Sequence, residues 1–91
     1  MYKAVIAGYS RSPFTMARKG GLIDIKPVNL LAEVIKDLVS KSKINQNDIE
    51  DVVIGCAFQV GEQCFNIGKL VTFLTGMDIK TSGMTVDRWC G

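Results

Sequence analysis

The segment that begins at Pro27 is the most strongly periodic part of the chain, and it constrains the fold more than any other. Proline suits the first turn of a helix, where its missing N–H group has no partner to lose. Six apolar side chains then recur at helical spacing on one face: Leu30, Leu31, Val34, Ile35, Leu38 and Val39. Because an isolated helix of this length is marginal in water, this face is expected to dock on a sheet.

Three short apolar runs are the candidate strands of that sheet. They are Lys3–Gly8, Asp51–Ala57 and Met84–Asp87, and each is bounded by turn residues or glycine. A second helix is predicted over Phe65–Gly76 between the last two runs, with Asn66 as its N-cap. Gly68 inside this helix costs about 1 kcal/mol of helix propensity relative to alanine, which suggests close packing against another element.

The order strand, helix, strand, helix, strand predicts an α/β fold. Its connections are long enough for right-handed β-α-β crossovers on a mostly parallel sheet. Ligands of such sheets bind at the carboxyl ends of the strands. The chain of 91 residues, with 47% hydrophobic and 22% charged content, is globular in class and amounts to one domain at most.

Charge and hydropathy exclude several classes of partner. The net charge of +2 is scattered along the chain, whereas nucleic-acid binders concentrate basic residues in a patch, so no nucleic-acid partner is expected. No apolar run reaches the roughly 18 residues of a membrane span. The start of the chain does not resemble a signal peptide either, and a cytoplasmic protein is therefore expected.

The three cysteines are expected to be free thiols, because the count is odd and there is no secretion signal. None of them has C-x-x-C spacing and the chain has no histidine, so no metal site is predicted. Cys56, within the second apolar run, is interpreted as a core thiol, and Cys64 as a loop or interface residue. Cys90 differs, because it follows the last apolar run at a change of chain direction and precedes a glycine.

Cys90 is the candidate nucleophile, although a cysteine at a strand end is as often only packing. If a helix began near Gly91, its free N–H groups and positive dipole would point at the sulfur. That arrangement would favour the thiolate and bind a developing oxyanion.

The last seven residues carry a family resemblance. Thr85–Gly91 (TVDRWCG) resembles the nucleophile motif of the thiolases, T-V-N-R-x-C followed by Gly or Ser. Arg11–Phe14 matches the R-T/S-P-F turn of that family, and Gly61–Gln63 with Phe65–Lys69 resembles the loop and helix start of degradative 3-ketoacyl-CoA thiolases. The resemblance spans nearly all of the chain, in the right order.

For the fold, the resemblance implies the β-α-β-α-β portion of a layered αβαβα thiolase fold. Residues 1–91 would be the N-terminal part of a thiolase-like N-terminal domain, incomplete in this chain. The family's two histidines and second, acid/base cysteine have no counterpart here, since there is no histidine and neither Cys56 nor Cys64 lies in such a motif. The resemblance also implies a homodimer or homotetramer.

For the activity, the resemblance implies that Cys90 attacks the acyl carbonyl and holds the acyl group as a thioester. CoA, or the α-carbanion of a second acyl-CoA, then takes that group, so CoA is a substrate and no cofactor is permanently bound. Degradative cleavage of 3-ketoacyl-CoA, as in fatty-acid β-oxidation, is preferred over acetoacetyl-CoA formation and over a related ketosynthase, whose motif lacks T-V-x-R. A non-catalytic piece that serves packing or assembly is the alternative of another class.

Two residues near Cys90 depart from the family pattern. Asp87 stands where Asn is usual and adds a negative charge that would disfavour thiolate if it pointed at the sulfur. Trp89 replaces a commoner aliphatic residue; it either narrows an acyl pocket or is a core aromatic, and the core position is the preferred interpretation.

Overall fold

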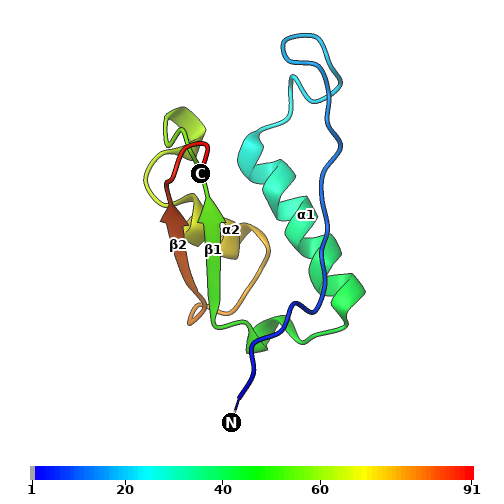
Figure 1. The fold of residues 1–91 in the computed structure, drawn as a ribbon, viewed down its shortest axis with the longest axis vertical. Helices are drawn as coiled ribbons and strands as arrows, with labels where there is room; N and C mark the ends of the chain where they lie inside the picture. The colour runs from blue at the N-terminus through cyan, green and yellow to red at the C-terminus, as the bar shows by residue number, and fades with distance from the viewer. Residues whose placement is uncertain (1) are drawn as a thin grey trace.

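A two-stranded parallel sheet and two helices make up the regular structure of the protein (Figure 1). The computed structural model describes residues 2–91. In chain order the elements are α1 (Pro27–Ser42), the 3₁₀ turn η1 (Gln46–Asp48), β1 (Asp51–Gly55), the 3₁₀ turn η2 (Gly61–Gln63), α2 (Ile67–Leu74) and β2 (Ser82–Val86). The predicted α/β class is confirmed, and both helices and the last two strands form close to where the sequence places them.

The parallel ladder aligns Asp51 with Ser82 at one end and Gly55 with Val86 at the other. One further backbone bond extends it at the carboxyl end, where the Cys56 N–H donates to the Val86 carbonyl at 3.0 Å. The two chain segments that follow β1 and β2 therefore leave the sheet side by side. This is the end of the sheet where the sequence places the candidate site.

The strand predicted at Lys3–Gly8 is not formed. Val5 is 80% exposed and Ile6 95% exposed, and the segment has no regular structure. It passes the C-terminal end of α1, where Gly8 lies close to Leu38 and Ser42, and the chain then continues alongside α1 (Figure 1). The sequence prediction fails here because a strand exists only through a ladder, and this segment lies against a helix without pairing with β1.

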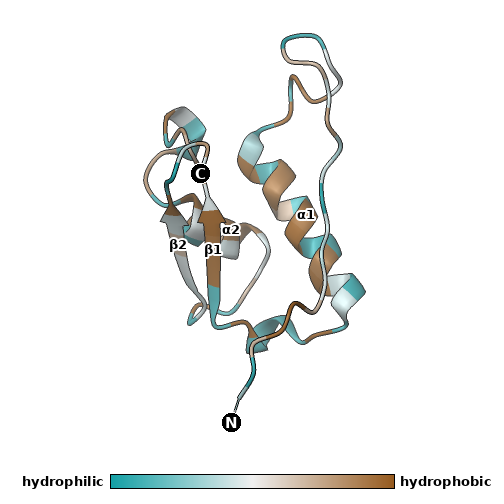
Figure 2. Ribbon diagram, viewed as in Figure 1, coloured by the Kyte–Doolittle hydropathy of each residue, from teal (hydrophilic) through white to brown (hydrophobic). Residues whose placement is uncertain are grey.

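Helix α1 packs mainly against α2 and η2, so the prediction that its apolar face docks on the sheet is wrong. Its two buried residues are Val28 and Ala32, one turn apart, while the six larger side chains of the predicted face are half-buried. A groove of about 340 Å³ separates α1 from β1, with Leu38 on one wall and Val52 on the other. Apolar residues line this side of the helix in Figure 2.

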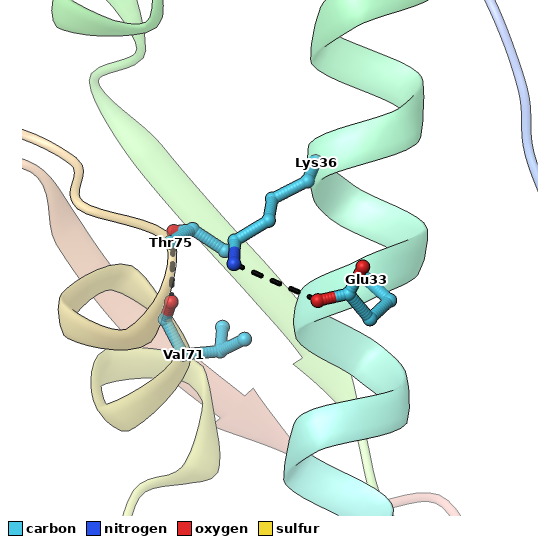
Figure 3. Close-up of polar contacts among 4 residues, drawn as sticks. All are labelled: Glu33, Lys36, Val71 and Thr75. Carbon is cyan, nitrogen blue, oxygen red and sulfur yellow. Dashed lines mark hydrogen bonds and ion pairs between the residues drawn. The ribbon is translucent and has the colours of Figure 1, made fainter.

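Among residues 2–91, helix α2 contains two of the three most deeply buried side chains, Val71 at 0% and Thr72 at 1% exposure. The buried Thr75 hydroxyl donates to the Val71 carbonyl at 2.8 Å, which satisfies it inside the helix (Figure 3). On the facing helix, Lys36 and Glu33 form an exposed ion pair at 3.6 Å (Figure 3). The α1–α2 contact is thus apolar at its centre and charged at its rim.

Both ends of α2 are capped. The Asn66 side chain accepts the Lys69 N–H at 3.2 Å, as the sequence predicts for an N-cap. At the other end the Gly76 N–H donates to Phe73 and the Met77 N–H to Thr72, with Gly76 at φ 71°. These two bonds and the left-handed glycine form a Schellman motif.

The start of α2 lies directly on the backbone of β2. A Cβ atom at Gly68 would be 2.2 Å from the Met84 carbonyl oxygen, and one at Gly83 would be 2.5 Å from the Gly68 carbonyl oxygen. No side chain fits at either position without a shift of main chain. The close packing expected from Gly68 is confirmed, and its partner is a second glycine.

The first prediction concerns this contact. We expect Gly68→Ala to lower the free energy of unfolding by about 1–3 kcal/mol, the range for overpacking, despite the better helix propensity of alanine. Urea unfolding followed by circular dichroism measures the change. Gly55→Ala is the matched control, since nothing lies within 4 Å of a Cβ atom there. Equal stability of Gly68→Ala and the wild type would contradict the close contact.

A second prediction concerns the tie between the N-terminal segment and α1. The Asp37 carboxylate accepts from Lys41 at 2.8 Å and from the Ser10 hydroxyl at 2.6 Å. These two hydrogen bonds, that of Lys41 first, hold the pKa of Asp37 below its ordinary value of 3.8. Any stability that this ionised group contributes is complete above the ordinary value and is lost as the pH falls through the lowered pKa.

We therefore expect Lys41→Gln to raise the Asp37 pKa towards its ordinary value, and Ser10→Ala to raise it by a smaller amount. Carboxyl ¹³C chemical shifts followed through an acid titration measure both. Ser12→Ala is the control, because the Ser12 hydroxyl bonds to the Pro13 carbonyl and not to Asp37. If Ser10→Ala left the Asp37 pKa unchanged, the hydrogen bond between the N-terminal segment and α1 would be absent in solution.

Candidate active site

The carboxyl ends of β1 and β2 bring together the two segments that contain the candidate residues. Residues 56–63 follow β1, and residues 87–91 follow β2 and fold back over the end of the sheet (Figure 1). The two segments start side by side because β1 and β2 are neighbouring strands, and the Cys56 N–H donates a hydrogen bond to the Val86 carbonyl. An open groove of about 360 Å³ lies against the first segment and the end of β1, and its lining includes residues of α1, η2 and α2 but none of residues 87–91.

Cys90 lies on a tight turn and is exposed to solvent. The Gly91 N–H donates to the Arg88 carbonyl at 2.8 Å and closes the turn. The Asp87 carboxylate accepts the Trp89 N–H at 3.2 Å. Asp87, the departure from the family pattern, is thereby used by the backbone of the turn that contains the cysteine.

Trp89 is 64% exposed, so the preferred interpretation as a core aromatic is wrong. Its indole packs edge to face on Phe58, with ring centroids 4.8 Å apart and planes at 74°. Trp89 follows the strand end, where the chain has already left the sheet, and only the segment after β1 is within reach. No sequence pattern identifies Phe58 as its partner, because aromatic pairing between two loops follows no spacing rule.

The carbonyl of Phe58 is fixed by two donors from its own loop. Gln63 Nε2 donates to it at 3.0 Å, and the Cys56 thiol lies 3.4 Å from it. Cys56 is half-buried, so its interpretation as a core thiol is also wrong: β1 ends at Gly55, and Cys56 already belongs to the loop. Cys64 is half-buried at the end of η2, in agreement with its interpretation as a loop residue.

A polar cluster holds β2 against the start of α2 just before the Cys90 turn. The Thr85 hydroxyl donates to Asn66 Oδ1 at 2.7 Å and accepts the Gly68 N–H at 3.1 Å. Asn66 Nδ2 donates to the Gly83 carbonyl at 2.9 Å. Asn66 therefore has two roles: it caps α2, and it hydrogen-bonds to β2. The N-cap pattern in the sequence predicts only the first role.

The described residues contain neither a cluster of metal ligands nor a membrane-spanning helix. Among residues 2–91, no group of three or more His, Cys, Asp or Glu side chains is placed to hold a metal ion. None of the helices in that range is long and apolar enough to cross a membrane. The Cys90 thiol is exposed to solvent on its turn beyond the carboxyl end of β2.

A sequence profile described as "Thiolase, N-terminal domain" matches residues 4–91. Among curated proteins, the 3-ketoacyl-CoA thiolases of Shewanella frigidimarina and Marinomonas sp. are 36% and 35% identical, over 100% and 96% of this chain. The 3-ketoacyl-CoA thiolase of Bacillus subtilis is 32% identical over 99% of it. The chain spans only 22% to 24% of the length of these relatives.

The fold has a counterpart among solved structures. The acetyl-CoA acetyltransferase of Bacillus anthracis superposes with a TM-score of 0.68 over 76% of this chain and 17% of its own, at 22% identity. At that identity the match supports the fold alone. The profile that covers residues 4–91 shows that the chain belongs to the thiolase family.

Proposed function

We propose that this chain supplies the nucleophile of a thiolase-type acyltransferase, and that Cys90 is that nucleophile. The observation that carries the proposal is the placement of Cys90: an exposed thiol on a closed turn, at the carboxyl end of a parallel strand, inside the segment Thr85–Gly91. Cys56 also follows a parallel strand, but Cys56 and Cys64 are both half-buried and lie outside that segment. A thiolate is a strong nucleophile, and its acyl thioester has about the same energy as the CoA thioester to which the acyl group is then passed.

In the proposed reaction the Cys90 sulfur attacks the C3 carbonyl of a 3-ketoacyl-CoA. The bond between C2 and C3 breaks, and the leaving carbanion of acetyl-CoA takes up a proton. The sulfur of a second CoA then attacks the acyl–cysteine thioester, which releases a shortened acyl-CoA and returns the Cys90 thiolate. Each half-reaction exchanges one acyl bond for another, so no external oxidant or permanently bound cofactor is needed.

The finer assignments follow the relatives. These relatives are named 3-ketoacyl-CoA thiolases, which supports degradative cleavage over acetoacetyl-CoA formation. Residues 1–91 would act as the N-terminal part of such an enzyme and would be inactive on their own, because they do not contain its histidines or its acid/base cysteine. A cytoplasmic homodimer or homotetramer that acts in fatty-acid degradation completes the proposal.

The third prediction tests the nucleophile. We expect incubation with acetyl-CoA to add one acetyl group to the full enzyme that contains residues 1–91, with release of one CoA thiol, because acyl exchange onto a thiolate is close to isoenergetic. Intact-mass spectrometry detects the adduct, and peptide mapping should place it on Cys90. Cys90→Ala should abolish it, whereas Cys64→Ala should leave it unchanged.

Two results would oppose this assignment. An acetyl group that maps to Cys56 or Cys64 would move the nucleophile to the loop after β1. No adduct on any cysteine, at acetyl-CoA concentrations that acylate a thiolase relative, would favour the non-catalytic role in packing or assembly.

A further inference from the structure

Trp89 has an unusual backbone for its residue type. Its φ is 49°, in the left-handed region, which bulky side chains rarely adopt. Such a conformation is sterically strained and persists only where the surroundings enforce it. It lies directly before the exposed Cys90, so the residue that departs from low-energy geometry is the one that aims the thiol.

Two contacts enforce this conformation from opposite sides. The Asp87 carboxylate accepts the Trp89 N–H at 3.2 Å, which fixes the backbone on the strand side. The Phe58 ring packs on the indole with centroids 4.8 Å apart, which fixes the side chain from the loop after β1. An edge-to-face aromatic pair is stabilising beyond the area it buries, which offsets part of the backbone cost.

Phe58 can act as a brace because its own position is fixed. Its carbonyl accepts the Gln63 amide at 3.0 Å, and Gln63 is the last residue of η2. Its loop starts at Cys56, which is bonded to Val86 of the neighbouring strand. A continuous set of contacts therefore runs from η2 through Phe58 to Trp89 and the Cys90 turn.

We propose that Phe58 is a positioning residue for Cys90: its ring holds Trp89 in the left-handed turn and thereby sets the direction of the Cys90 sulfur. The inference deepens the proposed function and rests on it. Neither aromatic residue touches the reacting atoms in this role. Phe58 acts through Trp89, and Trp89 acts through the backbone it shares with Cys90.

The experiment compares two reactions of the same thiol in the protein. Acylation by acetyl-CoA requires one direction of approach, whereas alkylation by iodoacetamide tolerates many. We expect Phe58→Ala to slow acylation of Cys90 by about tenfold to a hundredfold, the effect of a misplacement of about 1 Å. Alkylation of Cys90 should change by less than about threefold, because a small reagent needs no fixed alignment. Phe58→Tyr keeps the ring and should restore acylation.

Trp89, the one tryptophan in the sequence, supplies a second readout that does not depend on acyl transfer. Its fluorescence anisotropy should fall in Phe58→Ala and stay at the wild-type value in Phe58→Tyr. Phe73→Ala is the matched control: Phe73 is 57% exposed against 59% for Phe58, and it packs under Lys69. This variant should leave both acylation and anisotropy unchanged.

The outcomes separate the two proposals. Equal acylation of the wild type and Phe58→Ala overturns the positioning role and leaves the nucleophile intact. If the wild type takes up no acetyl group, the proposed function fails, and Phe58 then has no catalytic role to support. Separately, an unchanged anisotropy in Phe58→Ala would show that the Phe58 ring does not hold Trp89 in place. Faster alkylation of Cys56 and Cys64 would show that Phe58→Ala unfolds. Phe58→Leu then replaces it, and wild-type acylation of that folded variant overturns the proposal.

Discussion

The contact between Gly68 and Gly83 is the constraint on which the rest of this structure depends. With no side chain on either residue, the backbone at the start of α2 lies directly on the backbone of β2. That distance brings Asn66 within hydrogen-bonding reach of both the Gly83 carbonyl and the Thr85 hydroxyl. A larger residue at either glycine would separate these groups and leave the helix cap and the strand clamp without their shared partner.

The clamp matters for the site because of what it leaves free. It fixes β2 up to Thr85, and the ladder with β1 fixes Val86. Hydrogen bonds therefore hold the chain in the sheet as far as Val86, and the chain leaves the sheet at Asp87. The same ladder sets the start of the loop after β1, which is why Phe58 and Trp89 meet although neither belongs to a helix or a strand.

Local patterns predicted what local interactions decide. Pro27 at the start of α1, the Asn66 cap and the tight packing at Gly68 each depend on groups a few residues away or on the absence of a side chain. The strand at Lys3–Gly8 could not be decided in this way, because β-branched residues favour pairing but do not provide a free sheet edge to pair with. The burial of Val28 and Ala32 was missed for a related reason: where helices approach closely, small side chains occupy the contact.

The sequence predicted which cysteine is the candidate nucleophile, but it did not predict which residues pack around the turn that contains it. The motif at Thr85–Gly91 identifies Cys90 among three cysteines, but it does not contain Phe58 or Gln63, whose contacts reach Cys90 only through Trp89.

The choice of tryptophan at position 89 explains why such a brace is needed. A glycine would adopt the left-handed turn at no steric cost, and it would also leave the turn without a side chain to hold it. A tryptophan in this conformation has a steric cost on the order of 1–3 kcal/mol, but its large rigid ring can pack against a neighbouring side chain. The turn before Cys90 is therefore defined by side-chain contacts with Phe58 and Asp87 in addition to its own backbone bond. In such an arrangement the direction of the thiol depends on the loop after β1 as much as on the strand that carries it.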